Sequence, residues 1–234
     1  MPLDRTNDRK TANLSTKNGL QSKIKNAFSL PAGNAFSCPG ATSFCQKICY
    51  AGQLEKMYPS FLALAMRNWD ILKDASIDVM YVELTNMIDA FEAECDKWNA
   101  PKKFRIHADG DFFNMFYVEA WSWVIAEHES IQFWAYTRSD FAADFLHKEN
   151  LPNLGLYFSG DPVNEAMAHT MADKGIRIAM VANTFDDAKA AFKGARCPEQ
   201  NKAIPLISDK GGACVACGLC VIGRANVLFS VSKK

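Results

Sequence analysis

The C-terminal part of the chain carries three cysteines at regular spacing, Cys214, Cys217 and Cys220. A C-x2-C-x2-C run is typical of ferredoxin-like sequences, in which one compact turn supplies thiolates to an iron–sulfur cluster. Zinc sites more often use separated C-x2-C pairs. The spacing therefore favours an iron–sulfur cluster, of the [4Fe-4S] type, over zinc as the less favoured metal and over ordinary thiols.

A second group of cysteines, Cys38, Cys45 and Cys49, lies near the start of the chain with the spacing C-x6-C-x3-C. This spacing needs a loop between the first two thiols, which Pro39-Gly40 can form, and one helical turn between the last two. Three small buried thiols are the alternative, since free cysteine packs as a hydrophobic residue. As cluster ligands, three thiolates would leave one iron of a four-iron cluster open to substrate, cofactor or water.

Cys197 is a further candidate metal ligand, and the spacing does not assign it to either group. It could complete the C-terminal set as C-x16-C-x2-C-x2-C, or it could complete the N-terminal set. In a third arrangement, cysteines from both groups bind a single cluster. The sequence therefore does not decide whether the protein holds one cluster or two. Cys95 has no neighbouring thiol and lies on the apolar stripe of a long predicted helix ending near Trp98, so we expect it to pack in the core.

Composition sets limits on the classes of protein that the chain can be. With 234 residues, of which 49% are hydrophobic, it can form one larger globular domain. Lysine plus arginine and aspartate plus glutamate both count 26, so the charge balance does not indicate a nucleic-acid partner, although it does not exclude one. No apolar run reaches the roughly 18 residues of a membrane span. We therefore expect a cytoplasmic protein with no membrane partner, in which cysteines serve metal ligation better than disulfides.

Short apolar segments alternate with amphipathic ones from Phe104 onward, which predicts strands alternating with helices. The expected strands are Phe104–Ala108, Gln132–Tyr136, Leu154–Phe158 and Ile176–Val181, with further strands at Ala27–Leu30 and near Asn226–Val231. The expected helices between them are Met115–Glu127, Phe141–Lys148, Val163–Asp173 and Phe185–Phe192. This order predicts an α/β fold with a parallel sheet of about six strands and helices outside, forming a partial or open barrel.

Three parts of the chain are expected within this fold. Residues 1–25 are polar and are predicted to form an N-terminal arm or surface turn. Residues 26–194 form the barrel-like domain, with the cysteine loop after its first strand. Residues 195–234 form a cysteine-rich segment that packs on the same domain.

Polar residues follow several of the predicted strands, and the carboxyl ends of parallel strands form the site face of such folds. Arg138 follows the predicted strand Gln132–Tyr136, where its guanidinium could bind a carboxylate or phosphate near a metal. We take Arg138, Asp111 and His107 as candidate catalytic residues, and Gly110, Asp111 and Ser159 as candidate cofactor-binding residues. Their alternative roles are ordinary ones, because such residues also form turns, helix caps and buried hydrogen bonds.

Several of these motifs together resemble a family of phage gene products, the Gene product 88 family. The motifs are Leu30-Pro31-Ala32-Gly33, Cys38-Pro39-Gly40-Ala41 to Cys49-Tyr50-Ala51, Arg105-Ile106-His107 with Gly110-Asp111, Tyr136-Thr137-Arg138-Ser139 and Cys217-Gly218-Leu219-Cys220. The resemblance covers most of the chain from Ala27 onward and implies no particular reaction.

The architecture also resembles, more distantly, that of radical S-adenosylmethionine enzymes with an auxiliary cluster. Those enzymes have a partial parallel barrel, a three-cysteine loop after the first strand, a Gly-Gly-Glu-like segment after the second, and often C-terminal cysteines for a further cluster. Here Cys38, Cys45 and Cys49 hold the loop position and Gly110-Asp111 the end of the second strand. The resemblance implies S-adenosylmethionine as a cofactor, but the family's usual loop spacing is C-x3-C-x2-C, which differs from the one here.

Three functions remain open from the sequence. The first is a cluster enzyme with an open iron and a small-molecule substrate. The second is a redox or structural iron–sulfur protein with a redox partner. The third is a zinc-bearing nucleic-acid protein of phage replication, which would act in the host cell and use lysines such as Lys17, Lys23, Lys25, Lys47 and Lys56.

Overall fold

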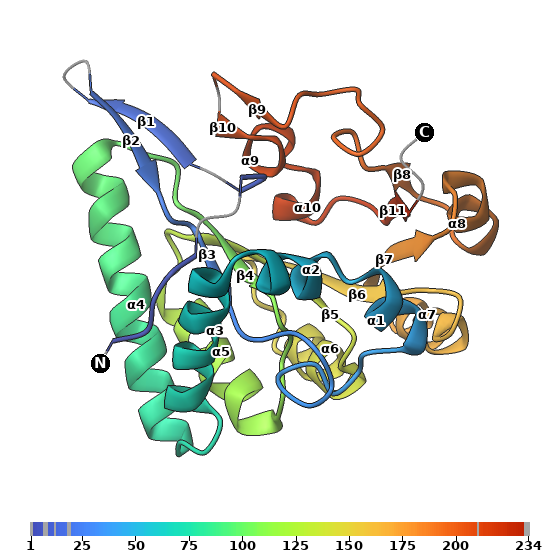
Figure 1. The fold of residues 1–234 in the computed structure, drawn as a ribbon, viewed down its shortest axis with the longest axis horizontal. Coiled ribbons are helices and arrows are strands. Elements are labelled where there is room, and N and C mark those ends of the chain that lie inside the picture. Colours follow the sequence, from blue (N-terminus) through green and yellow to red (C-terminus); the bar gives the residue numbers. More distant parts are fainter. Residues whose placement is uncertain (1, 7–8, 12, 18–19, 210, 232–234) are drawn as a thin grey trace.

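The computed structural model describes residues 2–6, 9–11, 13–17, 20–209 and 211–231 of the chain. Its centre is a seven-stranded sheet in which neighbouring strands run parallel (Figure 1). In spatial order the strands are β3 (Ala27–Ser29), β4 (Lys103–Asp109), β5 (Gln132–Thr137), β6 (Leu154–Gly160), β7 (Arg177–Ala182), β11 (Val227–Ser230) and β8 (Ala195–Arg196). The predicted α/β fold with an open parallel sheet is confirmed. The sheet does not close into a barrel, because β3 and β8 are its two edges.

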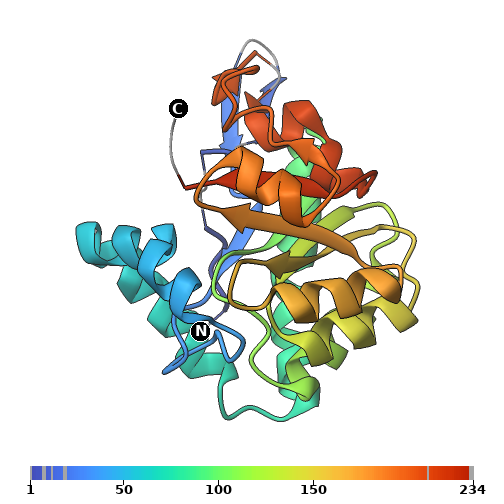
Figure 2. The ribbon, with the colours of Figure 1, turned by 90° about the vertical axis from the view of Figure 1, so that its right-hand side faces the viewer.

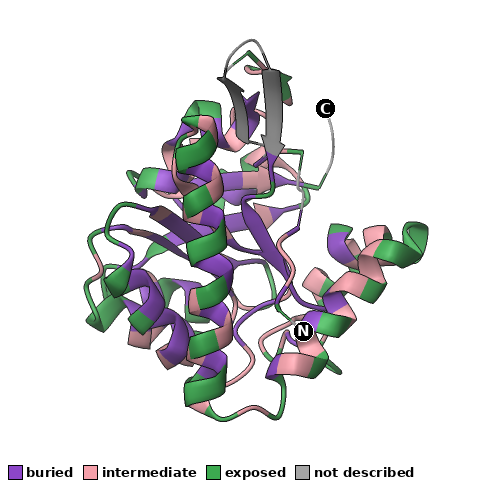
Figure 3. Cartoon of the chain, turned by 90° about the vertical axis from the view of Figure 1, so that its left-hand side faces the viewer, coloured by how far each residue is buried: buried purple, intermediate pink, exposed green. Residues whose placement is uncertain are grey.

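One face of the sheet is covered by five helices, which together bury the main core. These helices are α4 (Ile77–Trp98), α5 (Met115–Glu127), α6 (Asp140–Lys148), α7 (Glu165–Asp173) and α8 (Phe185–Ala191). Alternate strand residues such as Phe104, Phe133 and Ile178 point into this layer and are fully buried. Cys95 also lies in it, on α4, as expected from its place on the apolar stripe. Figure 3 shows the buried side of these helices turned toward the sheet.

The ends of the helices follow local capping signals in the sequence. Ser76 accepts a hydrogen bond from the backbone N–H of Val79 at the start of α4, and Asn99 ends that helix with a left-handed φ of 51°. Asn114 caps α5 in the same way through the N–H of Tyr117. The aromatic residues of α5 are not all buried, because Phe116 is 60% exposed and lies on the outer side of the helix.

The C-terminal segment covers the opposite face of the sheet. It contains a small hairpin of β9 (Ile207–Ser208) and β10 (Gly211–Gly212), followed by α9 (Ala213–Cys217) and α10 (Leu219–Ile222). The side-chain amide of Gln132 donates to the carbonyl of Val221 at 3.0 Å, and the hydroxyl of Tyr157 donates to the carbonyl of Ala225 at 3.0 Å. At Gly155 the approach is closer still, because a Cβ atom there would lie 2.5 Å from the carbonyl oxygen of Cys220. The backbone of α10 therefore rests directly on β6.

The beginning of the chain packs on the same assembly, although it was predicted as a polar arm or surface turn. β1 (Asn13–Lys17) and β2 (Leu20–Ile24) form an antiparallel hairpin beside the C-terminal segment (Figures 1 and 2). The backbone N–H of Thr6 donates to Ala27 at 2.7 Å, and Leu3 and Thr11 are buried. Residues 1, 7–8, 12 and 18–19 of the predicted arm, and residues 210 and 232–234 of the predicted C-terminal segment, lie outside the described residues.

Three further helices connect β3 with α4. They are α1 (Ser43–Ile48), α2 (Tyr50–Met57) and α3 (Pro59–Leu72), and the predicted cysteine loop runs from β3 into the first two. None of the helices in the described part of the chain is both long and apolar enough to cross a membrane.

Candidate metal sites

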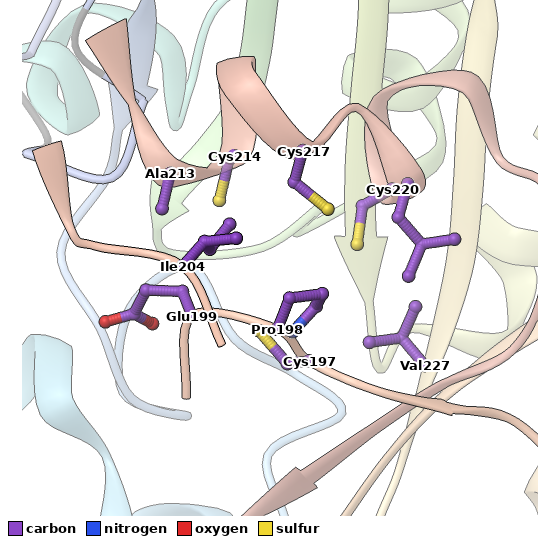
Figure 4. A pocket seen from close by; sticks show the side chains of 10 residues that line it. Cys197, Pro198, Glu199, Ile204, Ala213, Cys214, Cys217, Cys220 and Val227 are labelled. Atoms are coloured by element: carbon purple, nitrogen blue, oxygen red, sulfur yellow. The ribbon is translucent and has the colours of Figure 1, made fainter. Parts of the chain in front are cut away.

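Four of the predicted ligands meet in the C-terminal segment. Cys197, Cys214, Cys217 and Cys220 line one small cavity of ≈ 20 Å³, which is partly open to solvent. Figure 4 shows their sulfur atoms turned toward the same space, with Cys197 across the cavity from the other three. Cys197, which the sequence could not assign, therefore lies with the C-terminal cysteines; we call this group the four-cysteine site.

Local backbone geometry explains how these thiols come together. Cys214 and Cys217 are three residues apart on α9, so their side chains leave the helix on one side. Gly218 has a φ of 70°, which a residue with a side chain rarely adopts, and it turns the chain from α9 into α10 so that Cys220 faces the same cavity. Cys197 follows the edge strand β8, where its N–H donates to the carbonyl of Leu228 at 2.9 Å.

Burial dominates the ionisation of two thiols of the four-cysteine site, Cys220 and Cys197. It raises the pKa of the Cys220 thiol to about 11, even though the nearby hydroxyl of Tyr136 lowers this pKa. Burial also raises the pKa of Cys197, and the positive charge of Lys10 acts in the opposite direction. The thiols of Cys197 and Cys220 are therefore protonated at neutral pH without a metal, and a metal that binds them must displace these protons.

The start of the chain closes one side of the four-cysteine site. The N–H of Cys214 donates to the carbonyl of Lys10 at 2.9 Å, and Lys10 forms an ion pair with Glu199 at 2.7 Å. A Cβ atom at Gly212 would lie 2.5 Å from the carbonyl oxygen of Lys10, so only glycine permits this approach. The N-terminal residues around Lys10 and the C-terminal segment therefore contact each other at the four-cysteine site.

The other three predicted ligands, Cys38, Cys45 and Cys49, form the cysteine loop at the carboxyl end of the sheet. Burial raises the pKa of Cys38 to about 12, and the nearby charges of Asp111 and Cys45 raise it further. Burial also raises the pKa of Cys45, with Arg138 acting against it and Cys49 adding to it. Each thiol is thus close enough to the next to affect its ionisation. Cys49 joins α1 to α2, where its sulfur accepts from the N–H of Gly52 at 3.4 Å.

A buried carboxylate fixes the cysteine loop to the sheet. Asp161, at the end of β6, accepts from the hydroxyl of Thr42 at 2.6 Å and from Nε of Arg138 at 3.2 Å. Thr42 in turn accepts from the N–H of Cys45 at 2.9 Å and caps α1. Arg138 is therefore already paired with a carboxylate rather than directed at an open space, and the arrangement positions Cys45.

Asp111 and Gly110 lie under the same loop. The carboxylate of Asp111 accepts from the N–H of Arg138 at 2.8 Å and from its neighbour Phe112 at 2.7 Å, while burial raises its pKa to about 6. Gly110 has a φ of 87°, and a Cβ atom there would lie 2.6 Å from the hydroxyl of Ser37. Both residues join the ends of β4 and β5 to the start of the loop.

His107 and Ser159, the remaining candidate site residues, do not contact the cysteine loop in the hydrogen bonds of the described residues. His107 is 3% exposed, and its ring packs among Phe112, Tyr117 and Phe28, with Nε2 at 2.9 Å from the hydroxyl of Tyr117. Its φ of 61° turns the side chain out of the strand alternation and into the helix-covered core. Ser159 is half-buried in β6, where its carbonyl accepts from the side chain of Asn164 at 3.1 Å.

The sequence did not assign the residues that position these sites to a role. Asp161 and Thr42 carried local signals, a carboxylate at a strand end and a capping residue three positions before Cys45. Lys10 carried no such signal, because it reaches the four-cysteine site only in the folded chain. Within the described residues, no group of three or more His, Cys, Asp or Glu side chains is arranged to hold a metal ion.

The chain is similar to known phage proteins over almost all of its length. The sequence model of the family described as Gene product 88 matches residues 1–223. The chain is 52% identical over 236 residues to the Gene 88 protein of Mycobacterium phage L5, with 99% of each chain covered. It is 49% identical over 237 residues to the Gene 88 protein of Mycobacterium phage D29, again with 99% of each chain covered. No solved structure matches the chain.

Proposed function

The chain belongs to the Gene product 88 family, and from its own residues we propose that it is an iron–sulfur protein with a [4Fe-4S] cluster in the four-cysteine site. The observation that carries the proposal is that Cys197, Cys214, Cys217 and Cys220 surround one cavity, although Cys197 is distant from the others in sequence. Four thiolates are the ligand set that a four-iron cluster takes.

The spacing of the thiols favours a cluster over a single zinc ion. Cys214, Cys217 and Cys220 follow each other as C-x2-C-x2-C, which is typical of iron–sulfur ligands, whereas zinc sites more often use separated C-x2-C pairs.

The cysteine loop is the second part of the proposal. Cys38, Cys45 and Cys49 supply three thiolates, so a four-iron cluster there keeps one iron open to a small-molecule ligand. Asp161, Thr42 and Arg138 fix the loop against the sheet, which supports a constant ligand geometry. S-adenosylmethionine as that small molecule, implied by the resemblance to radical enzymes, stays a prediction. A redox or structural role without a substrate is the alternative.

Metal and sulfide analysis of anaerobically prepared protein tests the proposal. We expect about four iron atoms and four sulfides per chain for one cluster, and about eight of each for two. Electron paramagnetic resonance of the reduced protein then distinguishes the sites, because Cys214→Ala removes the signal of the four-cysteine site and Cys45→Ala that of the loop.

Cys95→Ala is the matched control for these substitutions. Cys95 is buried on α4, and its sulfur contacts the carbonyl of Pro101 at 3.9 Å, so its removal leaves the iron content unchanged. Zinc in place of iron, with no acid-labile sulfide, would refute the proposal. Loss of all signals together in Cys214→Ala would instead indicate one shared cluster.

A further inference from the structure

The helices α1 and α2 leave large apolar side chains uncovered. α1 has no buried residue, and α2 buries only Ala51. Tyr50, Met57 and Tyr58 are all exposed, Tyr50 by 50% and Tyr58 by 56%. Figures 2 and 3 both show these helices projecting from the side of the molecule. Apolar surface that neighbouring helices leave in water is typical of an interaction surface.

Helical periodicity places the exposed side chains of α2 on one side. Tyr50, Gln53 and Met57 are spaced i, i+3 and i+7, so they form a stripe along the helix, and Lys56 lies next to it. The buried residue Ala51 lies on the other side, toward the rest of the protein. We call Tyr50, Gln53, Lys56 and Met57 the outer face of α2.

Positive charge dominates this part of the surface. Lys56 on the outer face of α2 and Lys47 in the last turn of α1 are exposed, and neither forms an ion pair within the described part of the chain. Glu55 is the single carboxylate of the two helices, and it accepts from the N–H of Ala32 at 2.7 Å. The two lysines therefore favour an anionic partner.

The Tyr50 side chain is anchored at its hydroxyl end. The hydroxyl donates to the carbonyl of Ala108 in β4 and accepts from the guanidinium of Arg105 at 3.3 Å. The ring is thus held against the sheet at one end while half of the residue stays exposed. An anchored ring loses little conformational freedom on binding, so it is well suited to stacking against a flat ligand.

We propose that the outer face of α2, together with Lys47, binds single-stranded nucleic acid. An unpaired base offers a flat face that stacks on the Tyr50 ring, and the lysines contact the phosphates of the same strand. A duplex keeps its bases stacked on each other, and an acidic peptide uses the lysines without needing the ring. No metal takes part in this binding, so it is independent of the function proposed above.

Fluorescence anisotropy with the full-length protein tests this binding. The probe is a fluorescein-labelled oligothymidylate of about 20 nucleotides, which is longer than the usual site for a single strand. We expect saturable binding that weakens as salt rises from about 50 to 200 mM. An oligouridylate of the same length shows whether DNA or RNA is preferred.

Two kinds of substitution separate stacking from charge. Tyr50→Ala should weaken binding about tenfold, the loss of one stacked base. Tyr50→Phe, which keeps the ring but loses its anchor, should bind with an affinity between those of the wild type and Tyr50→Ala. Lys47→Gln and Lys56→Gln should each reduce the slope of log affinity against log salt by about 0.7, the value for one phosphate contact on a single strand.

Phe116→Ala and Lys148→Gln are the matched controls. Phe116 is an exposed aromatic residue on α5, a helix without lysine or arginine. Lys148 is 71% exposed and forms an ion pair with Asp144 at 2.6 Å. Both variants should bind the oligonucleotide as tightly as the wild type does, with the same salt slope.

Four results would overturn the inference. No binding at low salt would overturn it outright, and unchanged affinity and salt slopes in the Tyr50 and lysine variants would place the strand elsewhere on the protein. A duplex that binds as tightly as the single strand would contradict stacking. Displacement of the strand by polyglutamate, with no effect of Tyr50→Ala, would assign the surface to an acidic protein. Iron and sulfide analysis of the same preparations tests the proposed function separately.

Discussion

Removal of the Asp161 carboxylate should release the cysteine loop from the sheet. The side chain of Asp161 is fully buried and accepts from Thr42, Arg138 and the N–H groups of Val163 and Asn164. Asp161→Ala leaves the guanidinium of Arg138, whose side chain is 16% exposed, without its carboxylate. It also deprives the Thr42 hydroxyl and two backbone donors of their acceptor.

The size of the effect follows from that burial. Breaking a buried ion pair by removing one partner costs about 3–5 kcal/mol, because the remaining charge loses its compensation. We therefore expect Asp161→Ala to lower the free energy of unfolding by that amount, measured by urea denaturation of the metal-free protein. With a slope of about 2 kcal/mol per molar urea, the midpoint falls by about 1.5–2.5 M.

A local readout and a surface control complete the experiment. Cys45 should react faster with a thiol reagent in Asp161→Ala, because Thr42 no longer holds the start of α1 against the sheet. Asp186→Ala is the control, since Asp186 pairs with Arg196 at 2.7 Å but is 86% exposed, and such pairs contribute about 0–1 kcal/mol. If Asp161→Ala costs no more than Asp186→Ala, the role assigned to Asp161 is wrong.

Two further predictions concern the close packing of the C-terminal segment and the buried histidine. Gly155→Ala places a Cβ atom 2.5 Å from the carbonyl oxygen of Cys220, so it should lower the free energy of unfolding by about 1–3 kcal/mol, measured by thermal or urea denaturation. Gly52→Ala is the control, because its Cβ atom would meet nothing closer than 4.0 Å, and it should leave the free energy of unfolding unchanged or raise it. Equal effects of the two substitutions would contradict the contact between α10 and β6. Burial, and secondarily Arg105, lowers the pKa of His107 from 6.5 to about 3, so the unfolded chain binds the extra proton first, and stability should fall as pH drops from 6.5 toward 3. Asp111, with its pKa raised by burial to about 6, opposes this loss as pH falls from 6 toward 3.8. His107→Gln should flatten the loss in urea titrations across this range, and an unchanged slope would count against the buried neutral histidine.

The local elements were largely readable from the sequence. The helix predicted over Met115–Glu127 has those bounds in the structure, and the predicted strands Gln132–Tyr136 and Leu154–Phe158 differ by one or two residues at their ends. Apolar periodicity decides these elements, because each strand and helix must bury one side against its neighbours. The two-residue strand β8 was missed, since Ala195-Arg196 is too short to show any period.

The roles of single residues were harder to predict than the helices and strands. Asp111 and Arg138 do lie at the cysteine loop, because carboxyl ends of parallel strands share one edge of the sheet. His107 shares their sequence neighbourhood but not their site, because a single residue with positive φ turns its ring into the aromatic core. Strand alternation by itself would have placed it on the other face.

The amino-acid sequence was enough to predict the order of the elements and to show two groups of closely spaced cysteines. Cysteine spacing is a local property, and a thiol three residues from another on a helical turn faces the same way in any fold. Which thiols lie together depends instead on how the whole chain folds. Cys197 reaches Cys214, Cys217 and Cys220 because β8 joins the edge of the sheet while α9 and α10 fold back over its face. The same chain path brings Tyr136 and Lys10 to that site, and no spacing rule records contacts made across a sheet.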